Sequence, residues 1–393
     1  QVHGRGNWVV TADSPYGPWS EPKDLHVGGI DPCIAVAEDG TKWLFLSGGM
    51  RKKLTADGLD TVEGTDEHVY DGWIFPSDWV TEGLCLEGPK LKKVGDWWYY
   101  LSAEGGTAGP PTSHMVTVAR SKSLDGPWEN SPYNPLIHTW NASDRWWSRG
   151  HGSLIDTPDG RWYCIYHAYE NGFTGLGRQT LLEPVQFDSE GWPRSVVADV
   201  AAPIAAPLPL HPVDRKAHLG EFRVGLDWKY YKDFAPSRAS IEDGVLTLKS
   251  TGTCPADSAP LMFVAGDHAY EFEAEIERTP GSVAGLVIYY DNRFYVGQGI
   301  NDRGTLRFRR DKGGVRSKLP DVEHIWLRIR NDNQVITGYY SLDGKEWVKE
   351  EWGMEISGFN HNTFHDFQSM LPGLMAAGNG EVKFSNFKYR VLD

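Results

Sequence analysis

An aspartate, a glutamate and a histidine stand at similar intervals in the first half of the chain. Asp31 lies in an Ile-Asp-Pro motif, Glu87 opens a Glu-Gly-Pro motif and His151 lies in Gly-His-Gly, so the steps 31→87 and 87→151 are 56 and 64 residues. Carboxyl and imidazole groups transfer protons in enzymes. One such motif alone reads more simply as a turn. Three such motifs at corresponding positions of a repeat favour a chemical site instead.

The sequence around each motif predicts the element that must position it. Each motif is followed by a polar turn and then by an aromatic run, at Trp43–Leu46, Trp97–Leu101 and Trp162–Tyr166. Each unit reads as strand, tight hairpin, strand. The repeat is somewhat longer than a common propeller blade of about 40 to 50 residues. In a propeller the first strand of every blade lies nearest the central channel, so we expect Asp31, Glu87 and His151 to occupy equivalent positions around one axial funnel.

The number of blades is a little over three. Residues 1–26 resemble the outer end of a blade, because their Gly-Pro-Trp segment recurs after the strand at 115–119. A propeller has at least four blades, and an incomplete ring leaves open sheet edges that proteins avoid. We therefore expect an N-terminal part that is absent from this sequence, with a separate N-terminal fragment as one way to complete the propeller.

The second half of the chain differs in composition and in the spacing of its expected strands. Residues 201–216 are rich in Ala and Pro and read as an extended linker. From 217 to 393, short alternating strands separated by Gly turns indicate a β-sandwich. No helix of ordinary length is predicted. The chain is therefore expected to be all-β, with a propeller in 1–200 and a sandwich in 217–393.

The composition excludes some classes of partner. The chain has 39 basic and 53 acidic residues and a formal charge of −14, which argues against nucleic acid and anionic membranes. Seventeen Trp and 17 Tyr suit sugar binding, although most aromatic side chains fill sheet cores. The four cysteines have no metal-type spacing and are expected to be buried free thiols. The compartment stays open between bacterial cytoplasm, periplasm and secretion.

Six motifs in order give the chain a family resemblance. Together with the sandwich-type segment from Trp347 to Phe387, they resemble glycoside hydrolase family 43, the β-xylosidases and α-L-arabinofuranosidases. The six lie at Ile30–Pro32, Glu87–Pro89, Val116–Ser121, Ser131–Pro135, Gly150–Gly152 and Leu176–Thr180.

The resemblance implies a five-bladed propeller with a concanavalin-like sandwich, and exo-acting, inverting release of xylose or arabinose from plant cell-wall oligosaccharides. It assigns Glu87 as general acid and Asp31 as the residue that tunes its pKa. Arg178 matches an arginine that contacts the sugar, and a surface ion pair is its plainer interpretation. His151 matches an axial histidine that binds a central water or, in some members, a structural Ca²⁺; a structural hydrogen-bonding role is favoured over metal ligation. No cofactor is required, and the general base, an aspartate, is expected in the missing first blade.

The physical chemistry agrees with the acid assignment. A glutamate at its usual pKa of about 4.3 is ionised at neutral pH and cannot donate a proton. A neighbouring Asp31 anion disfavours the anion of Glu87 and raises its pKa. Glu104 reads as a loop charge. Six further side chains near the expected funnel rim are weaker candidates for stacking on sugar: His114, Trp140, Trp146, Trp147, His167 and Phe173.

Two other functions compete with this interpretation. One is a retaining fructan hydrolase, whose family also joins a propeller to a sandwich; the Gly-His-Gly and Leu-Gly-Arg motifs favour the pentosidase. The other is a non-catalytic sugar-binding propeller with a lectin-like sandwich, which the intact Asp31 and Glu87 disfavour. The sequence does not separate xylosidase from arabinofuranosidase, and it leaves the oligomeric state open.

Overall fold

The computed structural model describes residues 6–209, 228–231, 235–309, 312–315, 319 and 322–392. The chain forms two compact units, one of Gln1–Asn171 with Arg178–Leu210, the other of Gly172–Gly177 with His211–Asp393. Helical structure in the described residues is confined to short turns: η1 (Thr174–Leu176), η2 (Pro236–Arg238) and α2 (His361–Phe364). None of the described helices is long and apolar enough to cross a membrane.

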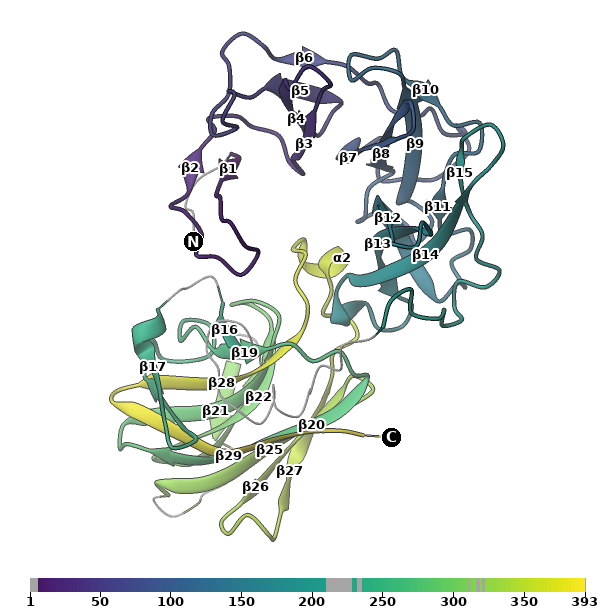
Figure 1. Cartoon of the computed structure of the whole chain (residues 1–393). Helices are drawn as coiled ribbons and strands as arrows, with labels where there is room; N and C mark the ends of the chain where they lie inside the picture. Colours follow the sequence, from purple (N-terminus) through teal and green to yellow (C-terminus); the bar gives the residue numbers. More distant parts are fainter. Residues whose placement is uncertain are drawn as a thin grey trace. The chain divides into compact units, whose positions relative to one another are not determined.

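Unit 1 consists of small antiparallel sheets that follow one another along the chain (Figure 1). A two-stranded sheet holds β1 (Trp8–Val9) and β2 (Lys23–Asp24). The next sheet holds β3 (Cys33–Val36), β4 (Lys42–Leu46), β5 (Met50–Lys53) and β6 (Glu67–His68). The third holds β7 (Glu87–Val94), β8 (Trp97–Glu104), β9 (Met115–Ser121), β10 (Glu129–Asn130) and β11 (Ile137–His138). The fourth holds β12 (Trp146–Asp156), β13 (Trp162–Glu170), β14 (Gln179–Phe187) and β15 (Pro193–Ser195).

The aromatic runs of the sequence form the second strands of these sheets and bind the blades together. In β8, Tyr99 packs in a cluster with Leu154 of the following blade, whereas Tyr100 packs with Phe45 of the preceding one. Successive side chains of a strand point to opposite faces, so one strand fills two interblade cores. Tyr99 and Tyr100 are 2% and 1% exposed, which shows that both faces of this strand are covered.

The first strands of the three larger sheets are neighbours. β3 contacts β7, and β7 contacts β12. In Figure 1 these three strands lie on the inner side of the row of sheets. This arrangement brings together parts of the chain that are more than a hundred residues apart.

Unit 2 is a sandwich of two seven-stranded sheets. One has the order β16-β19-β28-β21-β22-β23-β24, and the other β17-β18-β29-β20-β25-β26-β27. The first sheet holds β16 (Trp228–Tyr230), β19 (Leu261–Phe263), β21 (Ser282–Tyr289), β22 (Tyr295–Asn301), β23 (Gly304–Arg309), β24 (Lys312–Val315) and β28 (Leu371–Gly378). The second holds β17 (Ala239–Glu242), β18 (Val245–Lys249), β20 (Ala269–Arg278), β25 (His324–Asp332), β26 (Val335–Ser341), β27 (Val348–Glu355) and β29 (Glu381–Val391).

Strand alternation builds the core of this sandwich. In β25, Ile325, Leu327 and Ile329 are fully buried between the sheets. The intervening Arg328 lies on the other face, where it pairs with Glu273 over 2.5 Å. An antiparallel sheet with one face on the core and one toward water produces this pattern.

The predicted all-β chain of a propeller followed by a sandwich is confirmed. The second part of the expected linker, from residue 210 onward, lies outside the described residues. The expectation of four buried thiols is wrong. Cys164 is buried, but Cys85 is exposed and Cys33 and Cys254 are partly exposed.

Candidate active site

The three motifs share one backbone bend. Asp31, Gly88 and His151 have φ of +57°, +61° and +58°. This left-handed conformation is uncommon for residues with a side chain. Strand pairing slips by one residue at two of the bends, between Glu87 and Lys90 in β7 and between Gly150 and Ser153 in β12. The expected equivalence is therefore wrong by one residue, because Gly88, not Glu87, occupies the position of Asp31 and His151.

A space conflict explains why the middle motif carries glycine at this bend. A Cβ atom on Gly88 would lie 2.7 Å from Nε2 of His151. A side chain there would displace the imidazole, so the carboxyl group of this blade comes from the preceding residue, Glu87. The repeat still brings the groups together, since side-chain ligand atoms of Asp31, Glu87 and His151 all lie within 4.8 Å of one another.

The pKa of the Glu87 carboxyl is raised into the range that suits proton transfer near neutral pH. Burial in the site, then the negative charge of Asp31, raise its pKa from 4.5 to about 7, against the opposing charge of Arg178. The carboxylate of Glu82 adds a smaller rise. Burial is thus a larger cause than the neighbouring carboxylate that sequence reasoning emphasised. A carboxyl with this pKa is about half protonated at pH 7 and can donate a proton.

Arg178 lies close enough to Glu87 for its charge to affect the pKa of that carboxyl. It lies one residue before β14 and its side chain is exposed. Its positive charge lowers the pKa of Glu87 and also that of His151, His114 and His167. The Arg178 guanidinium therefore lies near enough to influence all four of these titratable groups.

Two further histidines line the inner side of the site. The rings of His114 and His167 stack at 5.2 Å, and His167 lies 5.7 Å from His151. Burial lowers the pKa of His114 to about 3 and that of His167 to about 2, so both are neutral at physiological pH. Their ring nitrogens have no hydrogen-bond partner among the described residues. The sequence offered both only as weak candidates for stacking on sugar.

Glycine again makes room for this histidine stack. A Cβ atom on Gly150 would lie 2.0 Å from Cδ2 of His114. The first glycine of the Gly-His-Gly motif is therefore explained by the packing of His114, which lies in the loop between β8 and β9. Sequence reasoning did not foresee this contact.

The expectation that Glu104 is a loop charge is wrong. Glu104 is the last residue of β8 and is 0% exposed. Its Oε1 accepts hydrogen bonds from the backbone N–H of Trp73 at 2.8 Å and from the hydroxyl of Thr117 at 2.9 Å. Burial raises its pKa to about 7. It holds the segment that follows Tyr70 onto the blade.

The other weak candidates fall in different surroundings. Trp146 packs partly buried against a blade core, and the indole N–H of Trp147 donates to the carbonyl of Ala142 over 2.9 Å. Trp140 is 62% exposed. Phe173 belongs to unit 2, where its ring stacks on His268 at 3.6 Å.

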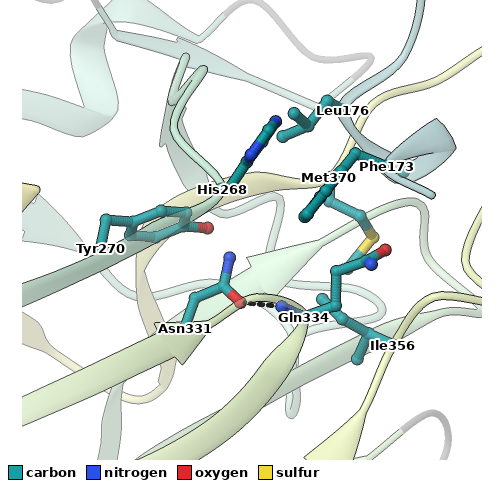
Figure 2. A pocket seen from close by; sticks show the side chains of 9 residues that line it. Phe173, Leu176, His268, Tyr270, Asn331, Gln334, Ile356 and Met370 are labelled. Carbon is teal, nitrogen blue, oxygen red and sulfur yellow. Dashed lines mark hydrogen bonds between the residues drawn. The ribbon is translucent and has the colours of Figure 1, made fainter. Parts of the chain in front are cut away.

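A pocket in unit 2 lies around Phe173 (Figure 2). In Figure 2 the side chains of Phe173, Leu176 and Met370 lie on one side, and Asn331 accepts a hydrogen bond of 2.8 Å from the backbone N–H of Gln334. No carboxyl group is among the residues that line this pocket, so it lacks the carboxyl pair that most glycosidases use. The carboxyl pair Asp31 and Glu87 lies in unit 1.

A propeller whose inner strands carry two neighbouring carboxyl groups, one of them Glu87 with its raised pKa, followed by a β-sandwich, defines a class of carbohydrate-active hydrolases. Sequence comparison then identifies the family: the chain belongs to glycosyl hydrolases family 43, whose profile matches residues 1–193. The beta xylosidase C-terminal concanavalin A-like domain matches residues 221–390. The chain is therefore an exo-acting glycoside hydrolase.

Relatives with established names support this assignment. The chain is 30% identical to a xylan 1,3-beta-xylosidase of Vibrio sp., covering 88% of this chain and 72% of the relative. It is 31% identical to the non-reducing end alpha-L-arabinofuranosidase BoGH43B of Bacteroides ovatus, over 99% of this chain and 77% of the relative. Among solved structures, the xylan beta-1,4-xylosidase of Bacillus halodurans C-125 matches with a TM-score of 0.84 and 26% identity, covering 99% of this chain and 82% of that one.

Proposed function

We propose that this protein is an inverting glycosidase that releases xylose or arabinose from the non-reducing ends of plant cell-wall oligosaccharides. The observation that carries the proposal is the half-buried Glu87 carboxyl beside Asp31, with a pKa of about 7. The names of the Vibrio and Bacteroides relatives favour pentose substrates.

In the proposed reaction, Glu87 donates its proton to the glycosidic oxygen as the bond to the anomeric carbon breaks. Positive charge develops on the sugar, and a water molecule attacks its opposite face. Arg178 binds sugar hydroxyl groups and fixes the ring beside Glu87. The general base is, by family resemblance, an aspartate of the first blade, and we assign that role to no residue of these 393.

Asp31 is too close to Glu87 to be that base. Inverting enzymes hold the two carboxyl groups about 6.5 to 9.5 Å apart so that water fits between them. Oxygen atoms of Asp31 and Glu87 lie within 4.8 Å. Asp31 is therefore proposed to keep Glu87 protonated and oriented.

The side chains of the site do not form a calcium cage. Ca²⁺ takes six to eight oxygen ligands. The groups that could meet one ion here are either three imidazoles, of His114, His151 and His167, or the Asp31 and Glu87 carboxyls with His151. Most ligands of a Ca²⁺ ion would have to be water, and no step of the proposed reaction uses a metal.

Two other functions remain testable alternatives. A retaining fructan hydrolase also has a short distance between carboxyl groups, about 5 to 5.5 Å, but it would need one of them as nucleophile. A non-catalytic sugar-binding protein would need no proton donor, so the raised pKa of Glu87 favours an enzyme.

Product analysis by proton NMR separates these functions. The full-length polypeptide, as isolated from its source, is incubated with xylobiose, with an aryl α-L-arabinofuranoside and with sucrose, and the anomer that forms first is recorded. Free xylose or arabinose of inverted configuration supports the proposal. Retained configuration or fructose release supports the fructan alternative, and binding without any product supports the non-catalytic one.

A further inference from the structure

Four aromatic rings from two segments of unit 1, the loop before β7 and the end of β11 with the residues after it, form one cluster. Trp79 stacks on His138 with ring centroids 4.6 Å apart and an angle of 8°. Trp140 stands perpendicular to both, 5.9 Å from Trp79 and 4.7 Å from His138. Trp73 contacts the other side of Trp79 at 6.0 Å. We call Trp73, Trp79, His138 and Trp140 the aromatic platform.

One ring of the platform is exposed, whereas most Trp side chains of this unit are packed. Trp140 is 62% exposed, while His138 is buried and Trp73 and Trp79 are partly buried beside it. A large, rigid ring left in water at a defined orientation offers an apolar face to a ligand.

Hydrogen bonds hold the loops that carry the platform. Oδ2 of Asp144 accepts the backbone N–H groups of Trp140 at 3.2 Å and Asn141 at 3.1 Å. Nε2 of His138 bonds to the carbonyl of Thr112 over 2.7 Å. Glu104 holds the backbone of Trp73. The rings are therefore ordered before any ligand binds, which lowers the entropy lost on binding.

The same loops lead to the proposed general acid. Glu82 lies three residues after Trp79, and its backbone N–H donates a hydrogen bond of 2.9 Å to the hydroxyl of Ser113, the residue before His114 of the site. Its carboxylate accepts the backbone N–H of Ala108 at 2.8 Å, in the loop that continues to Thr112 beneath His138. The platform is thus tied to the side of the site that Glu87 occupies.

We propose that the aromatic platform binds the sugar ring of the leaving group, with Trp140 stacked on its C–H face. A general acid protonates the leaving oxygen, so the leaving sugar lies on the side of Glu87. The occupant is therefore the sugar ring that stays with the leaving oligosaccharide, not the xylose or arabinose that is released from the non-reducing end. This inference rests on the proposed function, because it uses the role of Glu87.

The test compares two leaving groups on one released sugar. Trp140→Ala and Trp140→Phe are assayed with xylobiose or an arabinofuranosyl-substituted xylobiose, whichever the unmodified enzyme cleaves, and with the glycosyl fluoride of the same released sugar. Fluoride is a single atom and cannot reach the platform. Trp19→Ala is the matched control, since Trp19 is 55% exposed and lies outside the platform.

Trp140→Ala should lower kcat/KM for the oligosaccharide about tenfold. It should change kcat/KM for the fluoride by less than about twofold, and Trp140→Phe should recover most of the loss. An equal loss on both substrates, or no loss on the oligosaccharide, overturns the inference.

A binding measurement separates this inference from the proposed function. Isothermal titration of xylotriose into the unmodified protein and Trp140→Ala needs no turnover. If neither protein cleaves any substrate but Trp140→Ala binds xylotriose about tenfold more weakly, the proposed function fails and the platform stands. Equal binding overturns the platform.

Discussion

The backbone N–H of Gly88 donates a hydrogen bond of 3.2 Å to Oδ2 of Asp31. This bond connects the bend of one motif directly to the side chain of the preceding one. Glu87 precedes Gly88 in the chain, so the position of its carboxyl relative to Asp31 is set through the backbone. The Asp31 carboxylate, whose charge raises the pKa of Glu87, is therefore held in place by a direct hydrogen bond to the neighbouring residue Gly88.

Glu87→Gln should abolish the cleavage of natural glycosides and spare activated ones. A sugar alkoxide is a poor leaving group and needs a proton, whereas an acidic phenol leaves unaided. The measurement is kcat for xylobiose and for a 2,4-dinitrophenyl glycoside. Equal loss on both would show that Glu87 is not simply the proton donor.

Asp31→Asn should move the basic limb of the pH profile of kcat/KM to lower pH. In the unmodified enzyme this limb follows the deprotonation of Glu87, near pH 7. Removal of the Asp31 charge makes the Glu87 anion less unfavourable, so its pKa falls, while burial still keeps it above 4.5. Asn keeps an oxygen that can accept the Gly88 N–H. A limb that stays in place or moves upward would leave Asp31 only a geometric role.

Arg178→Ala should lower kcat/KM about 100-fold, equivalent to about 2.7 kcal/mol of transition-state stabilisation. It should also move the basic limb upward, opposite to Asp31→Asn, because the arginine charge lowers the pKa of Glu87. Arg161→Ala is the control, since Arg161 is an exposed partner of Asp159. Unchanged kcat/KM in Arg178→Ala would support the surface-ion-pair interpretation.

Gly88→Ala should inactivate the enzyme although the change is a single methyl group. The added Cβ would lie 2.7 Å from Nε2 of His151, at a φ that favours glycine. Gly95→Ala is the control, because Gly95 also has positive φ (+58°) but no atom within 4 Å of its added Cβ. Activity losses of the same size in both variants would assign the effect to backbone strain instead of to His151.

The strands were predictable because their patterns are local. Glycine turns and aromatic runs marked β8 and β13, and the predicted strand 115–119 lies within β9. The repeat of three motifs likewise predicted that Asp31, Glu87 and His151 lie together, and their ligand atoms are within 4.8 Å of one another.

What the sequence did not reveal depends on contacts between blades. The one-residue offset of Glu87 follows from the space that His151 takes above Gly88. An alignment of the dipeptides Asp31-Pro32 and Gly88-Pro89 would have shown that Gly88, not Glu87, corresponds to Asp31. The burial of Glu104 and the stack of His114 on His167 depend on loops that fold back across the sheet, which no periodicity records.

Glu104→Gln should stabilise the protein at pH 8 but not at pH 5. The pKa of Glu104 is raised to about 7 in the folded protein, because its carboxyl is buried. Below about pH 4.5 both folded and unfolded chains hold this proton, and between about 4.5 and 7 the unfolded chain releases it first. The free energy of unfolding of the unmodified protein therefore falls as the pH rises through this window. By pH 8 the loss from this one group is on the order of 3 kcal/mol.

Gln cannot ionise, and its side-chain oxygen can still accept the hydrogen bonds of Trp73 and Thr117. Urea unfolding of both proteins at pH 5 and pH 8 measures the difference, with the exposed Glu21→Gln as the matched control. The unmodified protein and Glu104→Gln should unfold at similar urea concentrations at pH 5, and Glu104→Gln at a clearly higher concentration at pH 8. If Glu104→Gln is destabilised equally at both pH values, the carboxyl stabilises the blade by its geometry and its buried charge carries no penalty.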